Sequence, residues 1–254
     1  MPALLAELIA ELERLLEPRR FRDYCPNGLQ VPGRADVAKI ATGVSASAEL
    51  FERAATEQAD LLIVHHGILW GSGPQPIDAA FKRRLKLLFD TDMSLAAYHL
   101  PLDAHPDLGN NASIAHALGA DALRPFALHE GEPIGFIAGF PGEGLTAKAL
   151  FERVAELTAR DPLVFDAGPE RIRSVAIVSG AGADYLAEAV AAGADAFITG
   201  EPTERVMAQA REAHIHFIAA GHYATETFGV RRLGVHLSER FGVEHVFIDV
   251  SNPI

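Results

Sequence analysis

The chain has 254 residues, of which 49% are apolar and 22% are charged, a composition typical of a folded globular protein. Its 34 acidic residues outnumber its 22 basic ones and give a net charge of -12, which disfavours a broadly basic nucleic-acid-binding protein. The single cysteine, Cys25, excludes an intrachain disulfide and a multi-cysteine zinc site, so a metal would have to be bound by His, Asp or Glu side chains.

The amino-terminal segment, residues 1–20, predicts an amphipathic helix because acidic residues lie among leucines at helical spacing. A secretion signal would have an unbroken apolar stretch there, and no later window reaches the roughly 18 uncharged apolar residues of a membrane helix. We therefore expect a cytoplasmic protein without a membrane span.

Short apolar runs typical of strands alternate with helical patterns along the chain, which predicts an α/β fold with mixed or mostly parallel sheets. The predicted strands are residues 39–44, 60–64, 94–98, 134–140, 174–178, 196–199, 216–219 and 245–249. The predicted helices between them are residues 46–58, 76–90, 111–118, 146–159, 183–192, 202–213 and 225–241. In such sheets ligands bind beyond the carboxyl ends of the strands, so residues that follow a strand are the first site candidates.

A composition break at residues 123–133, where Pro and Gly interrupt the periodicity, predicts two lobes within one unit of 254 residues. We expect one lobe to comprise residues 1–125 with the carboxyl-terminal segment 215–254, and the other to comprise residues 126–214. Because no Gly/Ser-rich hinge and no repeat is visible, we expect neither a linker-joined nor a repeat architecture.

The first candidate cluster is His65 and His66, which follow the predicted strand at 60–64. Adjacent side chains on a strand point to opposite faces, so both can reach one site only if the chain turns there, which Gly67 allows. The alternative is one packed and one solvated histidine. Trp70, shortly after the pair, is expected to belong to the core, with a pocket wall as the alternative.

The second cluster lies in residues 99–106, where two prolines predict a stiff, extended loop that displays His99, Asp103 and His105. The next segment, residues 109–113, predicts a helix start capped by asparagine. Free backbone N–H groups at this helix start could instead receive an anion.

The third cluster is His222 and Glu226, four residues apart at a predicted helix start. This spacing places both side chains on one helix face, where they could bind a metal; a capped helix with a charged face is the alternative. The three clusters together offer nitrogen and carboxylate ligands, which suit Zn, Mn, Fe, Co or Ni. Three histidines and two carboxylates exceed the needs of one open zinc site and favour two metals that hold a water as nucleophile.

Five segments of this chain resemble the NGG-interacting-factor-three-like family, whose bacterial members are called GTP cyclohydrolase 1 type 2 homologues. They are residues 24–30 (YCPNGLQ), 63–67 (IVHHG), 99–111 (HLPLDAHPDLGNN), 197–201 (FITGE) and 220–226 (AGHYATE). The resemblance implies two interlocked α/β lobes with a dinuclear metal site in the cleft between them, and assembly into a toroidal homohexamer.

The resemblance also implies the roles of individual residues. The metal ligands it implies are His65, His66, Asp103, His222 and Glu226. Supporting roles in proton transfer or ligand orientation fall to His99 and His105, and a further supporting role falls to Asn27.

Two functions fit this constellation. The first is a metal-dependent hydrolase of unidentified substrate, with nucleotides and phosphoesters among the candidates and Glu201 as a further proton shuttle. We find no Gly-rich phosphate-binding loop, since the turn at 180–182 is more simply structural. The second is a non-catalytic metal-binding ring that acts as a regulator or scaffold and engages a protein or, less readily given the net charge, a nucleic acid.

Overall fold

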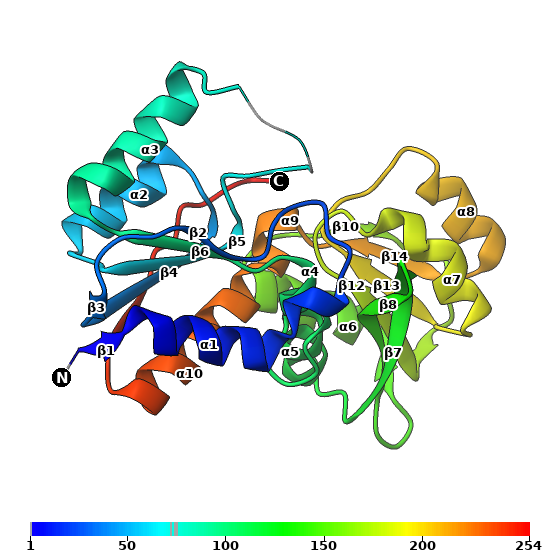
Figure 1. Ribbon diagram of the computed structural model, residues 1–254. Helices are drawn as coiled ribbons and strands as arrows, with labels where there is room; N and C mark the ends of the chain where they lie inside the picture. Colours follow the sequence, from blue (N-terminus) through cyan, green and yellow to red (C-terminus); the bar gives the residue numbers. More distant parts are fainter. Residues whose placement is uncertain (1, 72, 74–75) are drawn as a thin grey trace. The chain divides into compact units, whose positions relative to one another are not determined.

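The computed structural model describes residues 2–71, 73 and 76–254. It shows an α/β fold with two large mixed β-sheets, of six and five strands (Figure 1). The chain divides into a first unit, Met1–Leu102 with Gly229–Ser251, and a second unit, Asp103–Phe228 with Asn252–Ile254. The α/β class predicted from the sequence is confirmed. In this division the chain passes between units at 102/103, 228/229 and 251/252, whereas the lobes expected from the sequence met at 125/126 and 214/215.

The first unit is built on a sheet with the strand order β15-β4-β5-β6-β2. Its strands are β2 (Gly28–Val31), β4 (Lys39–Ser45), β5 (Leu61–His66), β6 (Ser94–Ala97) and β15 (Glu244–Phe247). Four strands are parallel, and β2 pairs antiparallel with β6 at the edge. Helices α2 (Ala48–Thr56) and α3 (Ala79–Thr91) pack their apolar faces on one side, and α1 (Leu5–Leu16) and α10 (Thr227–Phe241) lie on the other (Figure 1).

The second unit is built on a sheet with the strand order β10-β14-β13-β12-β8-β7. Its strands are β7 (Ala122–His129), β8 (Glu132–Gly139), β10 (Leu163–Phe165), β12 (Ser174–Val178), β13 (Ala196–Thr199) and β14 (His216–Ala219). Strands β12, β13 and β14 are parallel. Helices α5 (Asn110–Ala117) and α6 (Ala147–Thr158) bury apolar side chains on one face, and α7 (Leu186–Ala191) and α8 (Val206–Ala213) cover the other (Figure 1).

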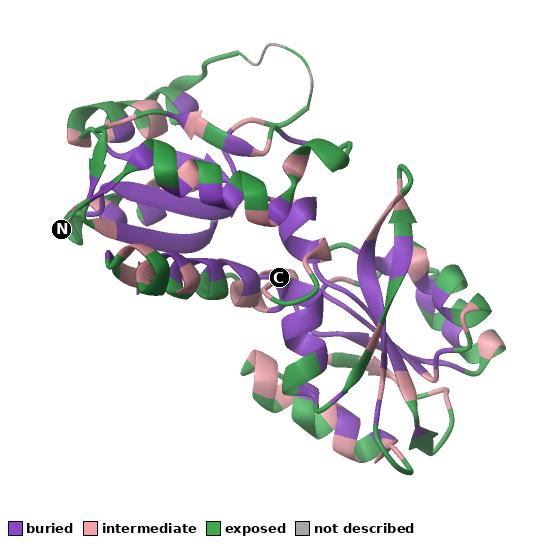
Figure 2. Ribbon diagram, turned by 60° about the horizontal axis from the view of Figure 1, so that its bottom comes forward, coloured by how far each residue is buried: buried purple, intermediate pink, exposed green. Residues whose placement is uncertain are grey.

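The central strands are buried in both units, as Figure 2 shows, and this explains why they are continuous apolar runs in the sequence. Smaller elements complete the fold: β1 (Ala3–Leu4), β3 (Asp36–Val37), β9 (Leu145–Thr146), β11 (Arg171–Ile172), α4 (Leu100–Ala104), α9 (His222–Thr225) and two 3-10 helices, Pro18–Arg20 and Ala183–Tyr185. In the part of the chain that the structure describes, no helix has both the length and the apolar character needed to cross a membrane.

Most predicted elements occur within a few residues of their expected positions, and the differences have physical causes. The predicted first helix began at Met1, which lies outside the described residues. The composition break at 123–133 is the antiparallel hairpin β7–β8, in which an edge strand tolerates Pro125. The loop expected to be extended contains the short helix α4, because a proline is compatible with the first turn of a helix.

Candidate metal centre

Three histidines of the first unit gather at the carboxyl end of its parallel strands. His65 and His66 end β5, and His99 follows β6 by two residues. Because Val64 of β5 pairs with Ala97 of β6, the three histidines reach the same edge of the sheet. Their ligand nitrogens lie within 4.8 Å of one another. The structure thus brings together the adjacent pair and the histidine that follows the next strand.

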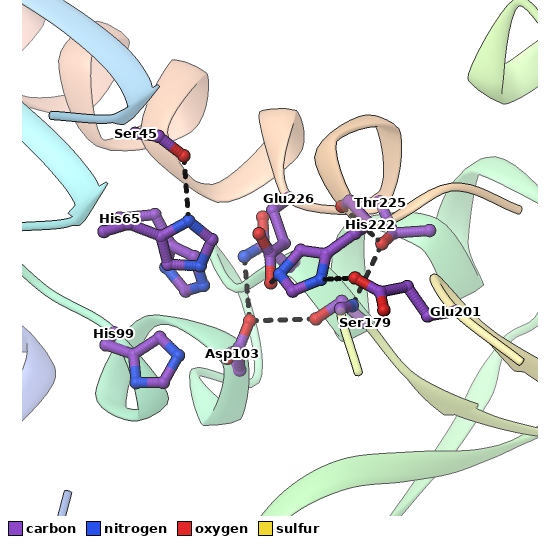
Figure 3. Close-up of polar contacts among 12 residues, drawn as sticks. Ser45, His65, His99, Asp103, Ser179, Glu201, His222, Thr225 and Glu226 are labelled. Carbon is purple, nitrogen blue, oxygen red and sulfur yellow. Dashed lines mark hydrogen bonds and ion pairs between the residues drawn. The ribbon is translucent and has the colours of Figure 1, made fainter. Parts of the chain in front are cut away.

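Each imidazole of the pair is fixed through its Nδ1 atom by a neighbouring strand. His65 Nδ1 lies 3.0 Å from the carbonyl oxygen of Tyr98. His66 Nδ1 lies 2.9 Å from Ser45 Oγ, the contact drawn from Ser45 in Figure 3. A carbonyl oxygen can only accept, so His65 Nδ1 carries the proton and Nε2 carries the lone pair that a metal requires. A second partner that fixes the ring in this way is typical of metal-binding histidines.

Asp23 fixes the third imidazole and was not predicted from the sequence. Its side chain is 2% exposed, and its carboxylate accepts hydrogen bonds from His99 Nδ1 at 2.7 Å, Asn27 Nδ2 at 2.8 Å and Leu100 N at 3.0 Å. Burial raises the pKa of Asp23, but the hydrogen bond and charge of His99, with the other donors, lower it overall. The position of Asp23 directly before the motif at 24–30 is the signal that could have identified it.

The candidate ligands of the second unit follow three parallel strands. Strands β12, β13 and β14 pair in register, so the segments that follow them, including Glu201 and His222, meet at one edge. His222 Nδ1 bonds a Glu201 carboxylate oxygen, and His222 Nε2 lies 3.1 Å from Glu226 Oε1 (Figure 3). Burial lowers the pKa of His222, but the hydrogen bonds and charges of Glu226 and Glu201 outweigh it and raise the pKa to about 9. This set therefore attracts positive charge.

Gly180 leaves the space that Glu226 occupies. Its φ is +63°, and a Cβ atom built there would lie 2.3 Å from Glu226 Oε1 and 3.2 Å from His222 Nε2. Gly180 N donates to Thr225 Oγ1 at 3.1 Å, which ties the turn to the segment that carries Glu226. The turn at 180–182, interpreted from the sequence as structural only, therefore shapes the site.

Asp103 is buried and held by an amide and a hydroxyl group. Its Oδ1 accepts from Asn110 Nδ2 at 2.8 Å and from Ser179 Oγ at 2.9 Å (Figure 3). These donors are neutral, so they orient the carboxylate without cancelling its charge. The predicted asparagine cap is wrong: Gly109 is the N-cap without a side-chain hydrogen bond, and Asn110 and Asn111 instead bond Asp103. Ser179 was not predicted from the sequence.

Two further predictions concern residues beside these sets. Trp70 is 39% exposed, with its ring centroid 5.7 Å from that of His66 and 5.5 Å from that of His99. The expectation that Trp70 belongs to the core is therefore wrong.

His105 Nδ1 accepts from the backbone N–H groups of Asp107 and Leu108, which fixes the loop. Its role in proton transfer stays a prediction.

The chemistry of both donor sets fits a metal. The first unit offers imidazole nitrogens, and the second offers an imidazole with carboxylates, which together match the ligand preferences of divalent transition metals. Both sets lie at the carboxyl ends of parallel strands, where ligands bind in open α/β sheets. The structure therefore contains two groups of His, Asp and Glu side chains that are compatible with metal binding.

Comparison with known proteins identifies the family. The model of the Duf34/NIF3 (NGG1p interacting factor 3) family matches residues 3–253. The chain belongs to this family. A Duf34/NIF3 relative from Pseudomonas aeruginosa, named GTP cyclohydrolase 1 type 2 homolog, is 45% identical over 255 residues and is covered, like this chain, over 100% of its length. A Vibrio cholerae relative of the same name is 42% identical, with 98% of each chain covered.

Solved structures agree with the family assignment. The protein ybgI, described as of unknown function, superimposes with a TM-score of 0.92 at 39% identity over 99% of this chain and 100% of its own. A Thermus thermophilus protein superimposes with a TM-score of 0.91 at 39% identity, with the same coverage. The chain therefore has the NIF3 fold over nearly its whole length, since both superpositions cover 99% of it.

Proposed function

We propose that this Duf34/NIF3 protein binds two divalent metal ions through His65, His66, Asp103, His222 and Glu226 and uses them for hydrolysis. The observation that carries the proposal is the cluster of three imidazoles in the first unit, whose ligand nitrogens lie within 4.8 Å of one another. Buried carboxylates of the second unit supply the negative charge that divalent cations need.

The bound ions would lower the pKa of a water molecule and offset the negative charge that develops on an ester, phosphate or amide oxygen. The protein's part is to hold its ligands rigidly: the Tyr98 carbonyl and the Asp23 carboxylate fix the tautomers of His65 and His99. Glu201 would orient His222 through its contact with Nδ1, and its side chain, 37% exposed, is suited to exchange protons between the site and solvent.

The substrate and the assembly are part of the proposal. The name of the relatives makes GTP a compound to include in any screen, together with other nucleotides, phosphoesters and cyclic amides. The homohexamer implied by the family resemblance is likewise proposed here, and light scattering on the purified protein would give the mass that tests it.

A substrate screen with the metal-loaded protein tests the hydrolase directly. We expect turnover of at least one class, lost in His65→Ala and Asp103→Ala and retained in His116→Ala, which removes an exposed histidine of α5. Turnover that survives complete metal removal would overturn the proposal. Metal retention without turnover of any class would also overturn it and favour the non-catalytic ring.

A further inference from the structure

Two exposed aromatic side chains lie beside the histidine cluster of the first unit. Trp70 is 39% exposed and Tyr24 is 57% exposed. Both contact the same imidazole: the ring centroid of His99 lies 5.5 Å from that of Trp70 and 6.2 Å from that of Tyr24. Large aromatic rings gain stability by burial, so two partly exposed rings around one polar residue form a surface that suits an aromatic ligand.

Backbone contacts hold both rings in place. Trp70 Nε1 donates to the Gly67 carbonyl at 3.1 Å, and Gly71 N donates to the Tyr24 carbonyl at 2.6 Å. The indole donor is therefore engaged within the protein, and the two loops that carry the rings are tied to each other. What Trp70 offers to a ligand is the exposed part of its apolar ring.

A cavity of about 740 Å³ is lined by Phe21 and Tyr24, and it reaches Gly71, the residue that follows Trp70 in the chain. Its volume falls within the range of about 300–1,000 Å³ that is typical of small-molecule sites. Arg19, Glu13 and Asp23 also line the cavity, so charges of both signs are present and neither sign selects the ligand alone. The aromatic walls are the more selective feature.

We propose that Tyr24 and Trp70 bind a planar heteroaromatic ring, such as a nucleobase, next to His66 and His99. Flat rings stack on exposed aromatic faces, and this interaction accepts different bases because each has a π-face. The inference rests on the proposed function in one respect, because the ring would be part of the substrate of that site. Ring binding by itself requires no metal.

The chain has one tryptophan, so fluorescence excited selectively at the indole, where its four tyrosines do not absorb, reports on Trp70 alone. We expect saturable quenching by adenosine monophosphate or guanosine monophosphate and none by ribose phosphate, which lacks the ring. Tyr24→Leu should weaken this binding by about 5- to 150-fold, the effect of removing one stacking partner. Tyr24→Phe should restore most of it, and Phe89→Leu, which removes an exposed aromatic ring from α3, serves as the matched control.

Calorimetry on Trp70→Leu provides the second measurement, and it should show a loss of the same order. Equal binding by the wild type, Tyr24→Leu and Trp70→Leu, or the absence of saturable binding of both nucleotides, would overturn the inference. Metal content is measured in the same samples. A protein that binds the nucleotides but holds no metal would contradict the proposed hydrolase and support the ring site. A metal-loaded protein that binds no nucleotide would contradict the ring site and leave the proposed hydrolase unaffected.

Discussion

The two units place different kinds of potential metal ligands at the same position, the carboxyl ends of their parallel strands. In both, parallel strands pair in register and release polar residues at their carboxyl ends. The first unit presents imidazoles fixed by a carbonyl, a hydroxyl and a carboxylate, whereas the second presents carboxylates around one imidazole. In both units the fold determines where potential ligands gather, while the partners of each side chain determine the charge that the set carries.

The largest expected effect comes from removing one ligand in either unit. His65→Ala in the first unit and Glu226→Gln in the second should each lower metal affinity by more than about 100-fold, since altering even the residues that orient ligands costs about 10- to 100-fold. Competition with a fluorescent chelator measures the affinity, with His116→Ala as the control. Full affinity in one of the two variants would show that its unit takes no part in binding.

Gly180→Ala tests how strictly the second unit is shaped. The added Cβ would lie 2.3 Å from Glu226 Oε1 and push this buried carboxylate away, so we expect metal affinity to fall by about 10- to 100-fold. Gly193→Ala is the matched control, because Gly193 also has a positive φ, +74°, but no atom lies within 4 Å of its added Cβ. Similar metal affinities in the two variants would contradict the assigned role of Gly180.

Asp23→Asn makes the corresponding change in the first unit. The amide removes the charge that fixes His99 Nδ1–H but keeps an acceptor. Because the ring centroid of His99 lies 4.9 Å from that of His65 and 5.6 Å from that of His66, a displaced His99 would disturb both proposed ligands. We therefore expect metal affinity to fall by about tenfold, the lower end for residues that orient ligands. Asp60→Asn is the control, because Asp60 is a buried carboxylate of the same unit that bonds the start of β4. An equal change of metal affinity in both variants would show that Asp23 stabilises the fold in general and does not specifically position His99.

Glu11→Gln tests how much a buried carboxylate of the first unit, surrounded by cationic side chains, contributes to the stability of the fold. Arg14, His236 and Arg240 lie within 3.2 Å of its carboxylate. The hydrogen bond from Arg14 is the largest influence on the pKa of Glu11 and lowers it, burial raises it, and the net effect is a pKa of about 2. A lowered carboxyl pKa stabilises the fold above the unfolded value near 4.5, and this contribution disappears as the pH falls toward 2.

The substitution should therefore cost about 1–2 kcal/mol at neutral pH and less in acid, because solvent screens the exposed arginines. Urea unfolding at several pH values measures this free energy, with Glu52→Gln on α2 as an exposed control. A loss that does not depend on pH would show that the charge of Glu11 is not its cause.

The sequence was sufficient to predict the central strands and the covering helices, because buried parallel strands are continuous apolar runs. It did not predict β2, β7 or β10, which lie at sheet edges or pair antiparallel and therefore have a weaker pattern. The hydrogen-bond partners of the site residues were harder to predict. Asp23 and Ser179 bond His99 and Asp103 across 76 residues of sequence in each case, a relationship that no local spacing can reveal.

Metal analysis of the protein purified without chelator shows whether both units bind metal. We expect about two divalent ions per chain in the wild type, as in dinuclear hydrolytic sites. We also expect the content to fall in both His65→Ala and Glu226→Gln, because each unit supplies ligands. A wild-type protein that holds no more divalent metal than these two variants would contradict the proposal.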